Sequence, residues 1–414
     1  MAEPLTILVA ARDEEVRIGE TVAVLKREFR DAEVLVADDG SRDATALAAE
    51  RAGAMVLRLP RLGKGQALTL AERRITPGRL LLVDADVRGD LAPLLDEEAD
   101  LAVAAFVESH GGGFGIAKRI ARLLIRACSG FDAREPLSGQ RALSQAARET
   151  CFPLAAGFGC EVRMTIDAAH AGLRVRELEL PLGHRSTGRD LRGFAHRARQ
   201  LLDALLACGP AARNYRGLRL PLVGSLVALG GVRASRRVGL SVAGIALLGL
   251  FDDLRSGPER GFRAHLQAGR TTGVLKATGI PVLSLAATRS LNGALLVSLG
   301  ANSLNLLDTR PGRALKTFLA GSLVLRGPTR HYVPVAVLLA PYDLGEMTML
   351  GDAGSNALGA VLGYGSVASF TARGRRLAIA ALAGLTIIGE TRSLGELIER
   401  TPGLSHLDRL GRRC

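Results

Sequence analysis

The first half of the chain alternates short apolar runs with charged, amphipathic stretches. Apolar runs rich in Leu, Val and Ala occupy residues 5–10, 33–38, 54–59 and 79–86. Runs of this length, bounded by turn residues, are typical of buried strands. The stretches between them, such as "EEVRIGETVAVLKREF" and "DATALAAERAG", carry apolar residues at helical spacing. Strand and helix in alternation predict a parallel sheet covered by helices, in an α/β domain over residues 1–210.

After about residue 210 the pattern changes to longer runs without charge. These runs cover residues 220–232, 238–251, 277–288, 290–307, 332–342, 353–372 and 377–389. Arg clusters at their ends are typical of membrane helices with basic cytoplasmic flanks. Most runs are shorter than the ~20 apolar residues of a standard spanning helix, so buried helices of a soluble bundle are the alternative. We predict an all-α, polytopic membrane domain over residues 211–414, preceded by a linker at 208–217.

The charge balance narrows the kinds of partner. Lys and Arg number 54 against 41 Asp and Glu, which gives a net charge of +13. Such an excess favours an anionic partner: nucleic acid, a phospholipid surface or a phosphorylated substrate. Aromatic residues make up only 4% of the chain and no reader motif is present, which disfavours nucleic acid. The five Cys include no C-x-x-C pair, which is typical of reduced, structural thiols.

Acidic residues follow two of the predicted strands. Asp38 and Asp39 end one strand in "VADDGSRDAT", and Asp84 and Asp86 end another in "LLLVDADV". Ligands of open parallel sheets bind at this edge, although Asp and Gly are also ordinary turn residues. Strand alternation places Asp84 and Asp86 on one face, where two carboxylates suit Mg²⁺ or Mn²⁺ holding a diphosphate. Lys64 lies between two glycines in "RLGKGQAL", a loop suited to a phosphate.

In this order the motifs resemble the family 2 glycosyltransferases of the GT-A fold, a Rossmann-like parallel sheet with flanking helices. The branch with polyprenyl-phosphate sugar synthases and glucosyl-phosphoglycerate synthases is especially similar. "ILVAARDEEVRIGETV", "SGQRAL" and "GFGCEVRMTIDAA" extend the resemblance over most of residues 5–200. It implies a nucleotide-sugar site lined by Ala10, Arg12, Glu14, Asp38, Asp39, Lys64 and Asp84, with Asp84 and Asp86 as the D-x-D metal motif.

The same resemblance suggests roles for later residues. Glu161 stands where the family often keeps an acid near the acceptor, so it is the candidate general base; a surface acid that starts a helix is the alternative. His184 corresponds to a late His that some members place on the metal, although a lone His is more often structural. The candidates for binding a diphosphate or a lipid phosphate are Gln140, Arg141, Arg185 and Arg189.

One amphipathic stretch bears on membrane contact. "IAKRIARLLIR" at 116–126 places Ile116, Ile120, Leu123 and Leu124 on one helix face, with basic residues opposite. This pattern is typical of an interfacial helix. An ordinary helix facing the core fits it equally well.

The second half repeats acidic and amide residues at the ends of its apolar runs. Asp252 and Asp253 are adjacent, which is unfavourable beside a low-dielectric region unless a cation compensates them. Asn302, Asn305 and Asp308 follow at spacings that put them roughly on one helix face. Each motif is also compatible with a helix cap or turn. Their recurrence in a single domain favours a shared site.

These motifs resemble those of the polyprenyl-phosphate sugar-1-phosphate transferases, the superfamily of phospho-N-acetylmuramoyl-pentapeptide transferase. D-D, N-x-x-N-x-x-D and G-D-x-G-S patterns occur in the family's order over about residues 216–412. The resemblance implies that Asp252, Asp253, Asp308 and Asp352 surround Mg²⁺ and a diphosphate, with Asp253 and Asp352 on the metal. Asn302, Asn305, Lys276 and Lys316 are possible phosphate or lipid partners. The chain departs from the family in lacking an H-x-H motif near its end, where only His406 occurs, and a second acid after Asp308.

The leading hypothesis is a membrane-bound glycosyltransferase of cell-envelope glycolipid synthesis. It moves sugar from a nucleotide-sugar to a polyprenyl-phosphate-linked acceptor with Mg²⁺ or Mn²⁺. The second domain binds polyprenyl phosphate and, in the fuller form of the hypothesis, transfers a sugar-1-phosphate to it. The alternative is a single-activity glycosyltransferase on a non-catalytic anchor that binds lipid. Both versions predict membrane lipids as partners, no nucleic acid, and active sites on the cytoplasmic face of the inner or plasma membrane.

Overall fold

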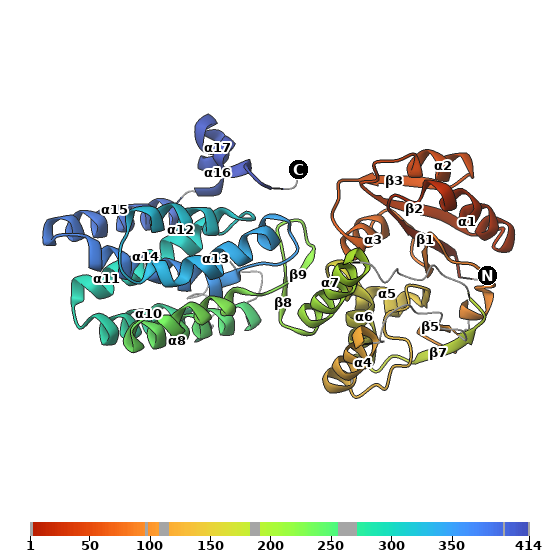
Figure 1. The fold of residues 1–414 in the computed structure, drawn as a ribbon, viewed down its shortest axis with the longest axis horizontal. Coiled ribbons are helices and arrows are strands. Elements are labelled where there is room, and N and C mark those ends of the chain that lie inside the picture. Colours follow the sequence, from red (N-terminus) through yellow and green to blue (C-terminus); the bar gives the residue numbers. More distant parts are fainter. Residues whose placement is uncertain are drawn as a thin grey trace. The chain divides into compact units, whose positions relative to one another are not determined.

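The chain forms two compact units, which divide between Pro221 and Leu222. The computed structural model describes residues 3–95, 98–106, 116–182, 191–255, 271–391 and 394–412, and Figure 1 follows them in chain order. Met1–Pro221 is called the N-terminal unit below, and Leu222–Cys414 the C-terminal unit.

The boundary lies beyond the predicted one at residue 210, because the expected linker is folded. Residues 211–221 form a hairpin of β8 (Ala211–Arg213) and β9 (Arg219–Pro221). The hairpin is held to the N-terminal unit by an ion pair between Arg219 and Asp167. Arg73 also donates to two carbonyls of the hairpin turn, each at 3.0 Å. These contacts make the segment part of the first unit.

A seven-stranded sheet forms the centre of the N-terminal unit, in the order β3-β2-β1-β4-β6-β5-β7. The strands are β1 (Leu5–Ala11), β2 (Glu33–Asp39), β3 (Met55–Leu59), β4 (Arg79–Asp84), β5 (Leu101–Phe106), β6 (Arg141–Leu143) and β7 (Val175–Leu180). The helices are α1 (Glu15–Glu28), α2 (Thr45–Arg51), α3 (Lys64–Glu72), α4 (Ile116–Ser129), α5 (Gln145–Cys151), α6 (Cys160–His170) and α7 (Leu191–Cys208), with short 3₁₀ turns η1 (Ala92–Leu95) and η2 (Gly157–Gly159). The predicted parallel α/β sheet is confirmed except at β6, which runs antiparallel to both β4 and β5.

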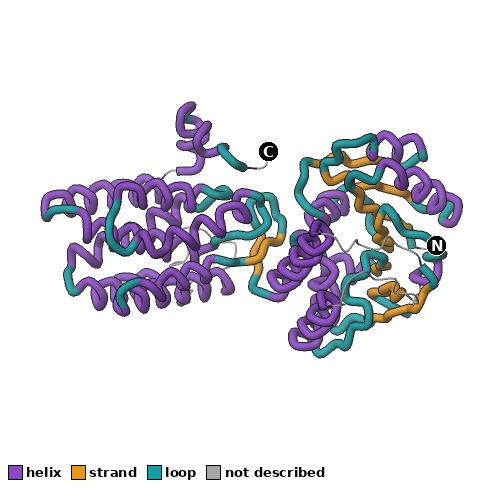
Figure 2. The backbone as a smooth tube through the Cα atoms, viewed as in Figure 1, coloured by secondary structure: helices purple, strands orange, loops and turns teal. Residues whose placement is uncertain are grey.

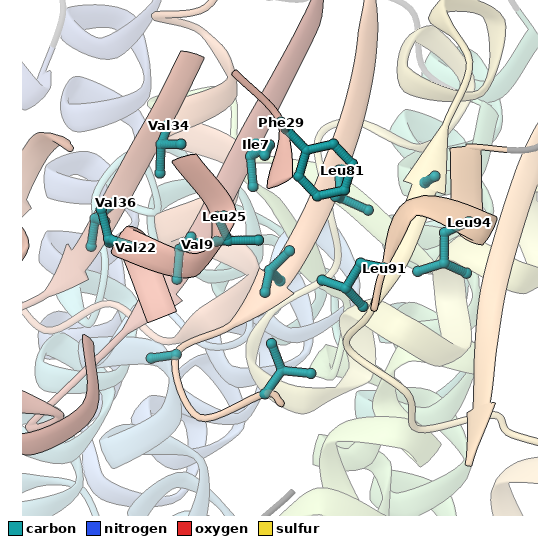
Figure 3. Packing of buried hydrophobic residues seen from close by; sticks show 14 of the residues in the cluster. Ile7, Val9, Val22, Leu25, Phe29, Val34, Val36, Leu81, Leu91 and Leu94 are labelled. Carbon is teal, nitrogen blue, oxygen red and sulfur yellow. The ribbon is translucent and has the colours of Figure 1, made fainter. Parts of the chain in front are cut away.

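Both faces of the sheet are covered by helices. Along β1, Ile7 and Val9 point to one face and Leu8 to the other, as strand alternation requires. Figure 3 shows the first face, where these strand residues pack against side chains of α1 such as Val22 and Leu25. Helices α3, α5 and α6 supply the buried residues on the opposite face. The parallel strands β1, β2 and β4 therefore lie between two apolar layers and end at one common edge.

The elements of the C-terminal unit are helices joined by loops over its described residues, as Figure 2 shows by colour. Its elements are η3 (Gly224–Arg233), α8 (Arg236–Arg255), α10 (Thr271–Thr288), α11 (Leu291–Leu307), α12 (Arg313–Val324), α13 (Thr329–Leu344), α14 (Gly351–Ser369), α15 (Ala372–Thr391), α16 (Leu394–Arg400) and α17 (Pro402–Arg409). Helix α14 is the most buried of these and packs against α8 and α11. Glycines allow this approach: a Cβ on Gly359 would lie 2.3 Å from the carbonyl oxygen of Gly300.

The predicted all-α architecture of this unit is confirmed, whereas its membrane character stays a prediction. Within the described parts of the chain, none of the helices by itself combines the length and apolar character needed to cross a membrane. Ala372–Gly389 and Leu394–Arg400 meet that test only as a pair, bent by 94°. Helix α8 has the length of a membrane span but fails the test because of its charges. It begins with Arg236 and Arg237 and ends with two carboxylates and Arg255.

Candidate functional site

Three side chains from distant parts of the N-terminal unit meet at the edge of the sheet. Lys64 is the first residue of α3, Asp84 ends β4, and Glu161 lies in the first turn of α6. The Lys64 Nζ atom lies 2.6 Å from Asp84 Oδ1 and 2.7 Å from Glu161 Oε1. Burial alone would lower the pKa of Lys64, but the charges of Asp84 and Glu161 outweigh it and raise that pKa above its ordinary value. The ammonium group therefore stays charged between two carboxylates.

Gln140, which directly precedes β6, orients Asp84. Its Oε1 atom accepts a hydrogen bond from the backbone N–H of Asp84 at 2.9 Å, and its Nε2 donates to Asp84 Oδ2 at 3.1 Å. The preceding residue must be small, because a Cβ on Gly139 would lie 2.2 Å from Asp84 Oδ2 and 2.6 Å from Lys64 Nζ. Gln140, which we predicted to bind a diphosphate, is thus already a partner of the D-x-D motif.

Asp86 does not share the strand face predicted for it. Strand β4 ends at Asp84 and the chain turns, with the N–H of Val87 donating to the carbonyl of Asp84 at 3.4 Å. Thr21 of α1 holds this turn through a 2.7 Å hydrogen bond to the carbonyl of Ala85. Asp86 is therefore presented from the turn that follows the strand rather than by strand alternation.

The donor set at this edge suits a metal that arrives with its substrate. Over residues 3–95, 98–106, 116–182 and the later described ranges, no group of three or more His, Cys, Asp or Glu side chains is arranged to hold a metal. Mg²⁺ commonly takes one or two carboxylates and completes its shell with water and substrate phosphates. Asp84 and Asp86 supply that number of hard oxygen ligands. His184 lies outside the described residues, as do Arg185 and Arg189.

The two acids at the end of β2 shape loops beside the site. Asp39 is buried and accepts hydrogen bonds at Oδ1 from the N–H groups of Leu62, at 2.6 Å, and Gly63, at 2.9 Å. It therefore fixes the glycine loop that leads into Lys64. Asp38 is also buried and accepts from the N–H of Ser41 at 3.0 Å. The predicted contact of both acids with a nucleotide stays a prediction.

The residues predicted at the end of β1 lie at the same edge. Ala10 pairs in register with Asp84 on one side and with Ala37 on the other. Arg12 follows the strand, and its Nε lies 3.6 Å from Asp13 Oδ2. Glu14 precedes α1 and pairs with Arg17 at 3.0 Å. Parallel register therefore brings the predicted nucleotide residues of β1, β2 and β4 to a single edge.

Glu161 is supported by the turn η2, whose residues begin the motif "GFGCEVRMTIDAA", and by α7, a helix that the sequence analysis did not single out. Its carboxylate is only 6% exposed, and its Oε2 accepts a hydrogen bond from Cys160 Sγ at 3.0 Å. The preceding turn η2 is held by Asp203 of α7, whose Oδ2 accepts from the N–H of Phe158 at 3.0 Å. Burial raises the pKa of Asp203 above its ordinary value. The only advance signal was the glycine on either side of Phe158, since Cβ atoms there would clash with Asp203.

Arg141 is not placed to bind a diphosphate, contrary to our prediction. Its side chain is fully buried in β6. Its guanidinium donates to the carbonyl of Ser138 at 2.8 Å, to Thr165 Oγ1 at 2.9 Å and to the carbonyl of Pro136 at 3.3 Å. Its donors therefore stabilise the segment leading to Gln140, and the prediction is wrong because these internal acceptors bury the charge.

Helix α4 buries a face that overlaps only partly with the predicted apolar one, since Leu124 packs against the buried cluster. Ala121 and Ile125 are completely buried, whereas Leu123 is 66% exposed. Lys118 pairs with Glu135, and Arg122 donates to the carbonyl of Ala133, so two of its basic residues bind within the unit. The helix therefore faces the core in part.

A second acidic cluster gathers in the C-terminal unit. Lys276 of α10 lies with its Nζ 2.8 Å from Asp252 Oδ2 of α8 and also contacts Asp352 of α14. Asp253 accepts hydrogen bonds from the N–H groups of Asp352, at 2.8 Å, and Ala353, at 3.0 Å, and so caps α14. Asp308, at the end of α11, lies close enough to Asp253 and Asp352 for their charges to interact. Four predicted acids and one predicted lysine thus lie together.

Asn302 and Asn305 of α11 contact two different helices. Asn305 Oδ1 accepts a hydrogen bond from Ser355 of α14 at 2.8 Å, beside the acidic cluster. Asn302 instead donates to Thr386 of α15 at 3.2 Å. The two partners differ because α11 packs against both α14 and α15, and the lipid or phosphate role of both residues stays a prediction.

Lys316 is also engaged elsewhere. Its ammonium group donates to the carbonyls of Asp408, at 2.7 Å, and Leu407, at 3.2 Å. Lys316 therefore holds α17 in place. It does not lie at the acidic cluster, where we expected it to bind a phosphate.

Comparison with known proteins gives a family match for part of the N-terminal unit. Residues 6–135 match the model of glycosyl transferase family 2. The N-terminal unit contains a family 2 glycosyltransferase domain. The match takes in Lys64, Asp84 and Asp86, and it lies wholly within the first unit, so the resemblance of the second unit stays a prediction.

Individual relatives cover a similar part of the chain. Glycosyltransferase AglJ of Haloferax volcanii is 30% identical over 187 residues, which are 42% of this chain and 62% of that protein. This chain therefore spans less than two thirds of that relative's length. An uncharacterized glycosyltransferase of Mycobacterium tuberculosis is 28% identical over 196 residues, 45% of this chain and 88% of the relative.

A solved structure is similar over about half of the chain. It is glucosyl-3-phosphoglycerate synthase from Mycobacterium tuberculosis in complex with Mn²⁺, uridine-diphosphate and phosphoglyceric acid. It shares 26% identity, covers 51% of this chain and 81% of its own, and has a TM-score of 0.42.

Proposed function

We propose that the N-terminal unit transfers a sugar from a nucleotide-sugar donor to an acceptor hydroxyl or phosphate. The contact of Lys64 with Asp84 and Glu161 carries the proposal, because it joins a phosphate-type lysine, the D-x-D carboxylate and a buried acid at one edge. In the transfer, the bond from the anomeric carbon to the donor diphosphate breaks and a bond to the acceptor oxygen forms. Where the acceptor is a hydroxyl, Glu161 takes its proton.

The donor diphosphate binds beside Asp84 and Asp86, with Mg²⁺ or Mn²⁺ neutralising its charge. Gln140 keeps the Asp84 carboxylate in place, and Asp39 keeps the Lys64 loop in place. When the donor enters, its phosphates give Lys64 a new anionic partner. Glu161 is then released from the ion pair to act on the acceptor.

The acceptor we propose is polyprenyl phosphate or a polyprenyl-linked sugar, held at the cytoplasmic face of the cell membrane. Support comes from large apolar side chains that stand exposed on the C-terminal unit, among them Val232 at 84% and Leu323 at 89%. The net charge of +13 favours an anionic lipid surface and a phosphate acceptor alike.

A second candidate function belongs to the C-terminal unit: transfer of a sugar-1-phosphate to polyprenyl phosphate. The meeting of Asp252, Asp253, Asp352 and Lys276 favours it, because clustered carboxylates beside a lysine suit a metal-bound diphosphate. The alternative for this unit is a non-catalytic anchor that only binds lipid.

One assay separates these functions. Purified full-length protein in detergent is given polyprenyl phosphate, Mg²⁺ or Mn²⁺ and a panel of nucleotide sugars, and the released nucleotide is identified. Release of nucleoside diphosphate that is lost in Asp86→Ala and kept in Asp352→Ala supports the glycosyltransferase. Release of nucleoside monophosphate with the opposite dependence supports the second candidate.

Asp31→Ala serves as the matched control, because Asp31 is an exposed acid before β2, at the opposite end of that strand from Asp38 and Asp39. It should leave either release unchanged. If wild-type protein releases no nucleotide from any donor, or if Asp86→Ala releases as much diphosphate as wild type, the glycosyltransferase proposal is wrong.

A further inference from the structure

An open cavity lies between η3 and α13 in the C-terminal unit. Its volume of about 350 Å³ falls within the range of roughly 300–1000 Å³ that small-molecule sites occupy. Its walls include the apolar side chains of Leu229, Val232, Pro334 and Val335, together with the basic residues Arg233 and His331. The cavity therefore combines an apolar surface with basic groups.

The apolar surface continues beyond the cavity on both elements. Residues three apart lie above one another in a 3₁₀ helix, so Leu226, Leu229 and Val232 form one row along η3. Residues four apart are neighbours on an α-helix, so Leu338 follows Pro334 on one face of α13. All five side chains are exposed. Two rows of exposed apolar side chains therefore extend from the cavity.

Elements η3 and α13 run antiparallel, which puts the two basic residues of the cavity at the same end of the rows. At that end the elements pack closely, since a Cβ on Gly230 would lie 2.5 Å from the ring of Tyr332 in the first turn of α13. At the other end the N–H of Val223, just before η3, donates to the carbonyl of Met349, beyond the end of α13, at 2.9 Å. Both rows therefore lead away from one basic end.

The charge at the basic end is positive. Arg233, Arg236 and Arg237 are all exposed, and Arg330 Nε donates to His331 Nε2 at 3.4 Å. Residues 216–251 and 309–342 contain no Asp or Glu. A guanidinium group binds a phosphate strongly because it can donate two parallel N–H bonds. The basic end therefore complements an anionic headgroup, and the apolar rows complement a hydrocarbon chain.

We propose that the surface between the two rows, called the η3–α13 groove below, binds an anionic phospholipid. Its phosphate lies at Arg233, and one acyl chain fills the cavity and follows the rows. A free phosphate would leave the apolar rows uncovered, and a lipid without net charge would leave the arginine charge uncompensated. Exposed apolar surface with a polar rim is typical of sites that contact lipids or other partners.

The η3–α13 groove is a different site from the acidic cluster of the same unit. Gly231 packs against the first turn of α8, where its Cβ would lie 3.0 Å from the Cα of Gly239. Asp252 lies near the other end of that helix, about 20 Å along the axis at a rise of 1.5 Å per residue. A phosphate at Arg233 therefore does not reach the acidic cluster, so the lipid in the groove is a structural partner and not the proposed sugar acceptor.

The test measures lipid binding by full-length protein that has been stripped of lipid in a neutral detergent. Native mass spectrometry follows three titrations: dioleoyl phosphatidylglycerol, dioleoyl phosphatidylcholine, and dioleoyl phosphatidylglycerol with an equal concentration of inorganic phosphate. The anionic lipid should bind with a Kd about tenfold lower than the zwitterionic lipid, because only its phosphate is free to offset the arginine charge. Inorganic phosphate should not displace it.

Two variants and a matched control assign the binding to the groove. Arg233→Ala should raise the Kd for phosphatidylglycerol about tenfold, because it removes a charged hydrogen-bond donor. Val232→Asp should raise it at least as much by placing a negative charge beside the phosphate, and it should fold because Val232 is 84% exposed. Arg373→Ala is the control, since Arg373 is an exposed arginine of α15. It should bind the lipid as wild type does.

Four results would overturn the proposal. They are equal Kd values for the two lipids, unchanged binding in Arg233→Ala, an equal loss of binding in Arg373→Ala, and displacement of the lipid by inorganic phosphate. The last result would indicate an anion site that does not hold a lipid. No result depends on sugar transfer, so failure of the proposed function would not affect this test.

Discussion

Replacing Lys64 by Met should destabilise the N-terminal unit, and the loss should depend on pH. Methionine keeps most of the apolar volume of lysine but removes the charge between Asp84 and Glu161. Two carboxylates would then face each other, and one of them, Glu161, is almost fully buried. The variant therefore tests whether the ion pairs of Lys64 hold this edge of the sheet together.

The expected decrease in the local free energy of opening is about 3 kcal/mol. At an effective dielectric constant of about 20, each of the contacts at 2.6 Å and 2.7 Å is worth about 6 kcal/mol before desolvation. Breaking a buried pair by removing one partner costs about 3–5 kcal/mol net. Because 31% of the Asp84 side chain is exposed, water offsets part of this, and the lower end of the range applies.

The sign of the pH effect follows from the direction of the Lys64 shift. The pKa of Lys64 is raised above its ordinary value of 10.5, so its contribution is fully present below that pH and is lost only as pH rises through the folded value. Between about pH 8 and pH 5 the contribution in wild type is therefore constant. In Lys64→Met, protonation of either carboxylate relieves the repulsion, so the deficit should shrink as pH falls.

Native-state hydrogen exchange with mass spectrometry measures this locally. The chain has two units and is not expected to unfold in one step, so the opening free energies of β4 and α6 are the useful quantities. Lys118→Met is the matched control, because Lys118 makes one ion pair, with Glu135, and is 35% exposed. It should cost less than about 1 kcal/mol. A Lys64→Met deficit no larger than the control, or one that does not change with pH, would refute the reasoning.

Three further substitutions test the close contacts of the two units. Gly139→Ala should lower sugar transfer by about 100-fold, because the new methyl group displaces Asp84. Initial rates check this, and an unchanged rate would contradict it. Arg313→Ala should lower the free energy of opening of α17 by about 3–5 kcal/mol, because it removes the hydrogen bonds of 2.9 Å and 2.8 Å to Asp408. Faster hydrogen exchange of α17 is the readout, and the exposed Arg400→Ala is the control. Asp253→Ala should cost about 1 kcal/mol by removing the cap of α14, seen as faster exchange at its first turn; unchanged exchange would contradict the capping role.

The sheet could be predicted where hydrophobic pattern and local turns agree. Strands β1 and β2 form where the apolar runs are, because each run is bounded by turn residues and has the right length for a strand. Strand β6 was not predicted, because Arg141–Leu143 is too short to show any period. Its pairing depends on β4 and β5 being already in place. The hairpin β8–β9 was missed for the same reason, since Arg219 needs Asp167 as its partner.

The candidate sites could be predicted as sets of residues but not as sets of contacts. A strand-end acid or a lysine between glycines is visible in sequence, because its chemistry is local. Arg141 shows the limit: arginine is normally exposed, and only the tertiary structure supplies the internal acceptors that make its burial tolerable. Asp203 shows the same limit. Nothing about an acid in an amphipathic helix indicates that it will accept a hydrogen bond from the N–H of Phe158.

Each of the two units contains a lysine that lies between two carboxylates. The chain contains five lysines, and two of them, Lys64 and Lys276, each bridge two carboxylates. An ammonium group is a compact charge that fits between two oxygens, whereas the planar guanidinium of arginine needs a wider, forked arrangement. In the structure Lys276 pairs with one of the two adjacent acids of α8, Asp252, and the metal predicted there stays a prediction. Each lysine therefore offsets part of the negative charge of its cluster, and any phosphate that binds must displace or share that lysine.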